Sequence, residues 1–229
     1  MINKTIGVVL ARSGSKGIKN KNIKIIEDRP LINYSLDALI KSKTCKRIIV
    51  STDSAMYKKL LISNYRNKID IFNRSKKFAK DSSSSEESLL EIFNSNLNIS
   101  ESFQKCIFFQ LTSPLIKPID FQKGLEVFKK KKYDSLFTGY ASKKFYWQKN
   151  KSKYLSLNYD FKNRPRRQNF EGNIVENGAF YIFDIKNFKK YKNRLFGNIG
   201  CYLMPENRSL EIDGSEDIKL FRYYLNHKN

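Results

Sequence analysis

The stretch TIGVVLARSGSKGIKNKN, residues 5–22, decides the fold of this chain. Positions 6–11 are apolar or small, which is typical of a strand that is buried on both faces of a parallel sheet. Small and cationic residues follow at once, and the glycines at 14 and 17 would let a ligand approach the backbone closely. Parallel sheets bind ligands at the carboxyl ends of their strands. The stretch therefore predicts a buried strand, 5–11, that leads into a ligand-binding loop.

Strand-like and helix-like runs alternate along the chain after this stretch. The further strands are expected at 47–51, 69–72, 106–110, 135–138, 178–184 and 200–204. The helices are expected at 30–42, 55–63, 86–97 and 119–131, with a last helix that has Ser215 as its N-cap. Such alternation predicts an α/β fold in which a mostly parallel sheet has helices on both faces.

Residues 139–176 break this pattern, because aromatic and basic residues occur there without a clear period. With 229 residues, the chain is long enough for one good core and short for two. We therefore expect a single domain, 1–229, with an excursion at about 140–175.

The chain is strongly basic, with a formal net charge of +22, and its hydrophobic share of 40% is that of a globular protein. A basic protein gains affinity for nucleic acids by releasing counterions. The lysines are spread over the whole chain, however, and arginine is the residue that usually forms forked contacts with bases and phosphates. We expect no nucleic-acid partner, and a non-catalytic nucleic-acid-binding module stays a distant alternative.

The number and spacing of the cysteines and histidines, and the lengths of the apolar runs, exclude several kinds of site and a membrane span. The three cysteines lie far apart and the one histidine is His227, so a disulfide framework, a Cys/His metal site and a histidine-based catalytic triad all fit poorly. Any metal ion is therefore expected on oxygen ligands. No apolar run approaches the roughly 18 residues that span a bilayer, so we expect a soluble, cytoplasmic protein with no membrane partner.

The loop after the first strand combines Arg12, Lys16 and Lys21 with Gly14 and Gly17, which suits a polyphosphate. Its spacing matches neither G-x-G-x-x-G nor G-x-x-x-x-G-K-[ST], so the dinucleotide-binding and P-loop interpretations do not apply. Phosphate binding is favoured, and a basic turn on a lysine-rich surface is the alternative.

Two carboxylates, Glu211 and Asp213, flank Ile212 near the C-terminus. On a strand, side chains at i and i+2 point to the same side. Together they could hold Mg²⁺, which prefers oxygen ligands and commonly bridges carboxylates to phosphates. Two solvated acids at a strand end are the alternative. If the N-terminal loop grips a triphosphate and these acids hold its counter-cation, the two segments must lie together.

Polar side chains also end other predicted strands. Gln110 carries an amide that could read a base edge. Residues 51–53, Ser-Thr-Asp, are interpreted equally as site residues or as a helix cap. The cluster Arg164, Arg166 and Arg167 suits bidentate binding of an acidic substrate, and a surface salt-bridge cluster or a subunit contact is the alternative.

Several of these motifs occur together in one known family. The segments are LARSGSKG at 10–17, KN at 21–22, VSTD at 50–53, QLTSPL at 110–115, RPRRQ at 164–168, ENGAFYIF at 176–183 and SLEID at 209–213. In this combination and order the chain resembles the acylneuraminate cytidylyltransferases. The resemblance implies a Rossmann-like nucleotidyltransferase fold, with the excursion forming a small dimerisation region whose residues reach the active site of the partner in a homodimer.

The resemblance also implies roles for individual residues. It places the CTP-binding loop at Arg12, Ser15, Lys16, Lys21 and Asn22, with Arg12 and Lys21 on the phosphates. It adds Arg74, Ser85 and Gln110 as nucleotide contacts. It implies contacts to the acidic sugar from Gln110, Arg166, Gln168 and Tyr181. It implies Mg²⁺ on Glu211 and Asp213, with glutamate in place of the first of the family's two aspartates, and the expected catalytic residues are Arg12, Lys21 and Asp213.

The reaction implied by the resemblance is transfer of CMP from CTP to the anomeric hydroxyl of an N-acylneuraminate, a nine-carbon 2-keto acid sugar, with release of pyrophosphate. Legionaminate, pseudaminate and 3-deoxy-octulosonate are alternative acceptors. Because the chain has no internal histidine, a carboxylate or a water on the metal is expected to deprotonate the acceptor hydroxyl.

Overall fold

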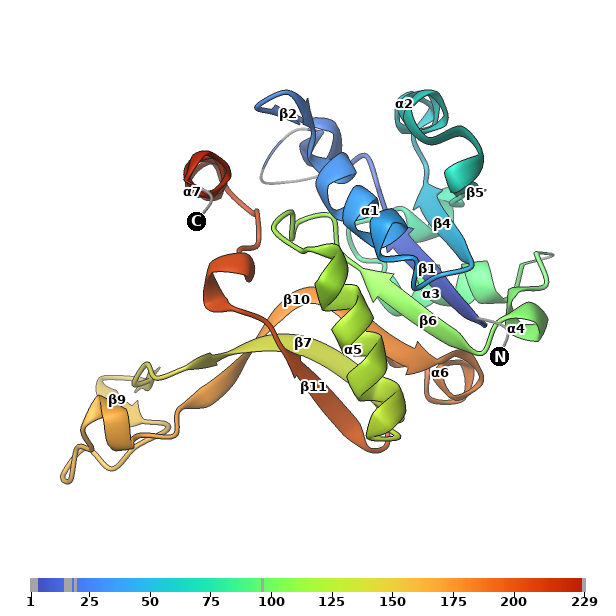
Figure 1. Ribbon diagram of the computed structural model, residues 1–229. Coiled ribbons are helices and arrows are strands. Elements are labelled where there is room, and N and C mark those ends of the chain that lie inside the picture. Colours follow the sequence, from blue (N-terminus) through green and yellow to red (C-terminus); the bar gives the residue numbers. More distant parts are fainter. Residues whose placement is uncertain (1–3, 15–17, 19, 96, 228–229) are drawn as a thin grey trace.

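The computed structural model describes residues 4–14, 18, 20–95 and 97–227 and is built around a seven-stranded sheet (Figure 1). Its strands, in spatial order, are β11 (Ile199–Leu203), β7 (Ser135–Ser142), β10 (Asn173–Asp184), β6 (Lys105–Phe109), β1 (Thr5–Leu10), β4 (Arg47–Thr52) and β5 (Asp70–Asn73). The β1–β4, β1–β6, β4–β5 and β7–β11 pairings are parallel, whereas β10 pairs antiparallel with β6 and β7. The expected mostly parallel sheet is confirmed.

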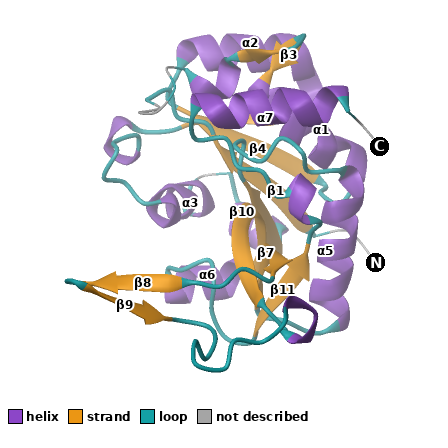
Figure 2. Ribbon diagram, turned by 90° about the vertical axis from the view of Figure 1, so that its left-hand side faces the viewer, coloured by secondary structure: helices purple, strands orange, loops and turns teal. Residues whose placement is uncertain are grey.

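Helices cover both faces of this sheet, as expected (Figure 2). One face carries α1 (Leu31–Ser42), α2 (Ala55–Tyr65) and α5 (Pro118–Lys130). The other face carries α3 (Ser85–Phe93), α4 (Ile99–Ser102) and α6 (Ile185–Tyr191). Successive strand residues alternate between the two cores, so that Val8 packs with α3 while Val9 packs with α1. A smaller apolar cluster holds the last helix, α7 (Ser215–Asn226), against the start of α1.

Short elements complete the chain around the first helix. A 3-10 turn, η1 (Lys21–Ile23), is followed by the two-stranded hairpin β2 (Ile25–Ile26) and β3 (Arg29–Pro30). In the described part of the chain, no helix has both the length and the apolar character needed to cross a bilayer.

The strands β7 and β10 run on beyond the sheet and carry residues 143–172, which we call the arm (Figure 1). The arm contains a second hairpin, β8 (Trp147–Asn150) with β9 (Lys153–Ser156), and a 3-10 turn, η4 (Arg167–Asn169). Figure 2 shows that it extends away from the layers of the core.

Several predicted boundaries were wrong; the strand expected at 178–184, for example, begins at Asn173. The third long helix ends at Phe93 rather than at residue 97. The last helix has Gly214, not Ser215, at its N-cap position, because the carboxylate of Asp217 accepts hydrogen bonds from the backbone N–H groups of Asp213 and Gly214.

Candidate active site

A small cavity of about 130 Å³ lies at the carboxyl ends of β1 and β6, beside the start of α3. Its lining includes three residues predicted to contact a nucleotide, Asn22, Ser85 and Gln110. The other lining residues are Leu10, Phe108, Phe109, Leu111 and Thr112. The fold therefore brings together polar groups that are far apart in the sequence and surrounds them with apolar surface, as in sites that bind the base of a nucleotide.

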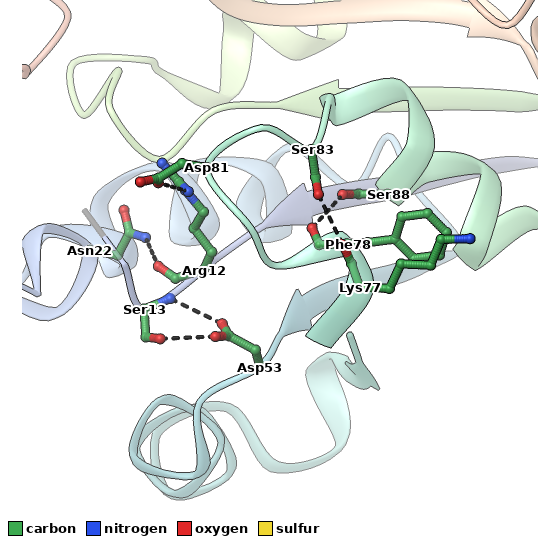
Figure 3. A network of polar contacts seen from close by, with 9 residues as sticks. All are labelled: Arg12, Ser13, Asn22, Asp53, Lys77, Phe78, Asp81, Ser83 and Ser88. Carbon is green, nitrogen blue, oxygen red and sulfur yellow. Dashed lines mark hydrogen bonds and ion pairs between the residues drawn. The ribbon is translucent and has the colours of Figure 1, made fainter. Parts of the chain in front are cut away.

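The loop after β1 is held by three separate contacts (Figure 3). Ser13 donates to the carboxylate of Asp53 from both its backbone N–H, at 3.0 Å, and its hydroxyl, at 2.9 Å. The side-chain amide of Asn22 donates to the carbonyl of Arg12 at 3.2 Å. The guanidinium of Arg12 forms an ion pair with Asp81. These contacts fix Arg12 just beyond the carboxyl end of β1, whereas the predicted nucleotide contacts at positions 15 and 16 lie outside the described residues.

The contacts of Asp53 correct one of the two interpretations of residues 51–53. Residues 51–53 do not provide the N-cap of α2. The N-cap is Ser54, whose hydroxyl accepts a hydrogen bond from the backbone N–H of Tyr57 at 3.3 Å. Asp53 instead braces the loop after β1. The sequence signal for this role was available, since Asp53 follows a strand directly at the carboxyl edge of the sheet.

The start of α3, where Ser85 lies, is also fixed. Ser84 and Glu87 form a reciprocal capping box, in which Ser84 Oγ accepts from the backbone of Glu87 and the Glu87 carboxylate accepts from that of Ser84. Ser88 Oγ donates to the carbonyl of Phe78 at 3.4 Å, in the segment that precedes the helix (Figure 3). The first turn of α3 therefore has a defined position in the wall of the cavity.

The cationic loop and the C-terminal acids are in direct contact. Lys21 Nζ donates to the carbonyl of Ile212 at 2.8 Å and pairs with Asp213 Oδ1 at 3.1 Å. Ile212 in turn donates its backbone N–H to the carbonyl of Thr112 at 2.7 Å, and the Thr112 hydroxyl donates to Glu211 at 3.3 Å. Both carboxylates therefore lie at the carboxyl ends of β1 and β6, next to the cavity.

The expectation that these acids lie on a strand was wrong, because residues 209–214 form no strand in the structure. The alternation of burial is nevertheless present. Ile212 is fully buried with Ile218 and Phe221 of α7, while the acids on either side of it are accessible to different degrees. The buried Ile212, with one acid on each side, therefore keeps Glu211 and Asp213 near each other, as the predicted strand would have done.

The ionisation of Glu211 is perturbed by its surroundings. Burial raises the pKa of its carboxyl group, and the nearby negative charge of Asp213 raises it further. A bound cation would relieve both costs. Among the described residues there is no cluster of three or more Asp, Glu, His or Cys side chains that could hold a metal ion. Two carboxylates fit Mg²⁺, which usually keeps several waters and takes further ligands from substrate phosphates.

Arg74 lies at the carboxyl ends of β4 and β5, with 7% of its surface exposed. Its Nε donates to Ser51 Oγ at 3.2 Å, while one of its terminal nitrogens is buried without a hydrogen-bond partner. Burial lowers the pKa of this guanidinium, although the nearby charges of Asp53 and Glu91 oppose the shift. A buried cation with an unused donor is the arrangement expected where an anionic ligand supplies the missing partner.

The side chain of Gln110 lies next to a glycine in a left-handed conformation. Gly178 has φ +61°, and a Cβ at this position would lie 3.4 Å from Gln110 Nε2 and 3.8 Å from Glu211 Oε1. A side chain there would be strained and would also crowd the amide. The glycine of the ENGAF segment therefore lets β10 pass close to the site.

Tyr181 lies one layer behind the cavity. Its ring is buried and stacks on Phe108, with 6.0 Å between ring centroids, and its hydroxyl donates to Glu176. Burial and then this hydrogen bond raise the pKa of Tyr181. Phe108 lines the cavity and Tyr181 does not, so the predicted sugar contact at Tyr181 lies behind Phe108.

Arg166 and Gln168 are two further predicted site residues that do not line the cavity in the single chain. Both lie in the arm, at and next to η4, and the backbone carbonyl of Gln168 accepts from Lys143 at 3.4 Å. The arm lies apart from the carboxyl ends of β1 and β6 (Figure 1).

With a mostly parallel sheet, a cationic loop and paired acids at the carboxyl edge of that sheet, the chain has the elements of a site that can bind a polyphosphate and its cation. Its fold is shared by a solved structure described as CMP:2-keto-3-deoxy-manno-octonic acid synthetase complexed with CTP, with a TM-score of 0.70. That alignment has 15% identity and covers 99% of this chain and 100% of the other.

The sequence comparisons specify the family. A family model described as "Cytidylyltransferase" matches residues 6–220. The N-acylneuraminate cytidylyltransferase of Oncorhynchus mykiss is 36% identical over 77% of this chain, which corresponds to 40% of that relative's length. Post-translational flagellin modification protein B of Campylobacter coli is 29% identical over 96% of this chain and 94% of its own length. The chain belongs to the cytidylyltransferase family.

Proposed function

We propose that this protein transfers CMP from CTP to the anomeric hydroxyl of an N-acylneuraminate and releases pyrophosphate. The observation that carries the proposal is the contact of Lys21 with both Ile212 and Asp213, since it joins a cationic loop to a metal-binding type of acid pair at one edge of the sheet. Two relatives of this chain with that activity in their names, from Oncorhynchus mykiss and Escherichia coli, support the choice of acceptor.

Different residues of the site would bind the base and the phosphates of CTP. Asn22, Ser85 and Gln110 would bind the cytidine in the cavity that they line. Arg12 and Lys21 would bind the phosphates, and in this structure each cation is paired with a carboxylate, Asp81 or Asp213, that a triphosphate can replace. Ser15 and Lys16 belong to the same proposed loop.

Catalysis would come mainly from positioning and charge neutralisation, because the hydroxyl attacks the α-phosphorus in line with the departing pyrophosphate. Mg²⁺ bound by Glu211 and Asp213 would supply Lewis-acid stabilisation of the phosphate oxygens. Lys21, with 15% of its side chain exposed, would add a charge that water screens only weakly.

The free cysteines, Cys45, Cys106 and Cys201, suit a reducing compartment, and the cytoplasm is the proposed location.

The proposal is tested by measuring pyrophosphate release from CTP with Mg²⁺ and a panel of acidic sugars. We expect release with N-acylneuraminate that exceeds release with CTP alone. A clear preference for legionaminate, pseudaminate or 3-deoxy-octulosonate would keep the reaction and change the acceptor. No release with any of the four sugars, together with salt-dependent binding to duplex DNA, would contradict the proposed enzyme.

The arm supports the proposal that the protein is a homodimer. It is a hairpin on two long strands, and isolated hairpins are marginally stable in water. Large apolar side chains are exposed on it: Trp147, Tyr154, Leu155, Leu157 and Phe161. An apolar surface of this kind is expected to be covered by another chain.

Subunit mixing tests whether the arm completes the partner's site. An Arg166→Ala protein and a Lys21→Ala protein should each be nearly inactive with the acidic sugar. After subunit exchange, up to about a quarter of wild-type activity should return, because half of the dimers are mixed and each mixed dimer has one intact site. Exchange demonstrated by a mass-tagged partner without any recovery of activity would show that Arg166 serves its own chain.

A further inference from the structure

Arg194 joins three elements around the nucleotide cavity although it lies in none of them. It belongs to residues 192–198, between α6 and β11. Its Nε pairs with Glu86 Oε1 of α3 at 2.6 Å. Its guanidinium carbon lies 5.1 Å from the ring centroid of Phe108 on β6 and 4.9 Å from that of Tyr181 on β10. One cation therefore ties a helix to two neighbouring strands.

One of these partners lines the cavity, and another is the sequence neighbour of a lining residue. Phe108 lines it, and Glu86 follows Ser85, which also lines it, in the first turn of α3. A shift of Arg194 would therefore move both the ring and the helix start that form one wall. Tyr181 is stacked against the far side of this arrangement, next to Phe108.

The segment that carries Arg194 is itself firmly held. The Ser135 hydroxyl donates to the carbonyl of Phe196 at 2.7 Å and accepts from its backbone N–H at 2.9 Å. The backbone N–H of Asn198 donates to Asp134 at 2.8 Å. The segment that carries Arg194 is thus fixed to β7 independently of α3. Arg194 can therefore restrain the position of α3 through Glu86.

The Arg194–Glu86 pair is energetically significant because both side chains are largely removed from water, with 18% and 21% exposed. Burial alone would raise the pKa of Glu86, but the hydrogen bond and charge of Arg194 outweigh it and lower the pKa. For Arg194, burial acts to lower the pKa and Glu86 outweighs this, so that its pKa is raised. The planar guanidinium can pair with a carboxylate and stack on aromatic rings at once, which an ammonium group does less well.

We propose that Arg194 is a positioning residue that sets the cytidine wall of the active site through Glu86 and Phe108. The inference rests on the proposed function and deepens it, because it assigns the support of the base pocket to a residue that does not line the cavity. Its effect should fall on recognition of the base and not on the phosphates, whose loop is braced separately by Asp53.

The test is titration of the full chain by calorimetry with two probes, CTP and inorganic triphosphate, both with Mg²⁺. Arg194→Met should raise the dissociation constant of CTP about tenfold and leave that of triphosphate unchanged. Glu86→Gln should have a similar effect, and the double variant should be no worse than the more affected single one, because the two residues act as one pair. Arg194→Lys should fall between wild type and Arg194→Met.

Arg47→Met is the matched control, since Arg47 pairs with Asp70 at the opposite, amino end of the parallel strands. It should leave both affinities unchanged. A merely structural role of Arg194 would lower the melting temperature or the binding stoichiometry while the CTP affinity of the folded fraction stayed at the wild-type value, and that result would overturn the inference. Equal losses for CTP and triphosphate would overturn it as well. Failure of the wild-type chain to bind CTP would instead overturn the proposed function.

Discussion

Replacing Asp213 by alanine is expected to lower kcat by on the order of a hundredfold or more at saturating Mg²⁺, with the protein still folded. The carboxylate is well placed to hold a cation, because 73% of its side chain is exposed and its single ion-pair partner among the described residues is Lys21. The neighbouring acid, Glu211, carries a raised pKa that reflects burial and the charge of Asp213. Loss of Asp213 would leave one carboxylate for the metal, and steady-state kinetics over a Mg²⁺ series measures the effect.

Binding without metal separates this role from a simple ion pair. In EDTA, Asp213→Ala should bind CTP as well as wild type or better, because a negative charge next to the phosphates has been removed. With Mg²⁺ its affinity for CTP should fall below that of wild type. Glu216→Ala is the matched control, since this exposed acid of α7 pairs only with Lys219 among the contacts described. Near-normal turnover of Asp213→Ala at low Mg²⁺ would refute the metal assignment.

The fold could largely be predicted because its elements have strong local signals. Runs such as 6–10 and 106–109 are apolar without interruption, and helix α5 begins at Pro118 with cations in its last turn. The direction and length of β10 could not be read in this way. Residues 173–177 show no clear strand period in the sequence. In the structure they belong to β10, whose pairing with β7 is irregular between Glu176 and Tyr181 and which runs on to carry the arm.

The site could be predicted only where its chemistry is local in sequence. The cationic loop and the acid pair each occupy a short motif, so their residue types indicated phosphate and metal binding. Their neighbours are set by the fold: Asp53 braces Ser13 across 40 positions, and Arg194 reaches Glu86 across 108. An arginine between a helix and a strand has no periodicity or motif that distinguishes it from the other arginines of a basic chain. Such supporting residues emerge only once the strands are in register.

Replacing Lys21 by methionine is expected to weaken CTP binding by on the order of tenfold or more, while the affinity for cytidine stays unchanged. Methionine keeps an apolar stem of similar length and removes the charge. The Lys21 side chain is 15% exposed, so the attraction of its charge to a phosphate is screened less than that of a surface lysine. A tenfold loss corresponds to about 1.4 kcal/mol, which one partly buried ion pair can supply. Calorimetric titration with CTP and with cytidine measures the two affinities separately.

Lys24→Met is the matched control for charge, because Lys24 is exposed and lies at the end of the same 3-10 turn. Its removal lowers the net charge equally and should leave CTP binding within about twofold of wild type at 0.15 M salt, where distant charges are screened. Lys21 also donates to the carbonyl of Ile212, so its loss could act by loosening the junction between the two chain ends. That case is distinguishable: a loosened junction would reduce cytidine and CTP affinity together, whereas loss of a phosphate contact reduces only the second. Equal losses of affinity for CTP and for cytidine would therefore show that Lys21 supports Ile212 and its flanking acids and does not bind a phosphate.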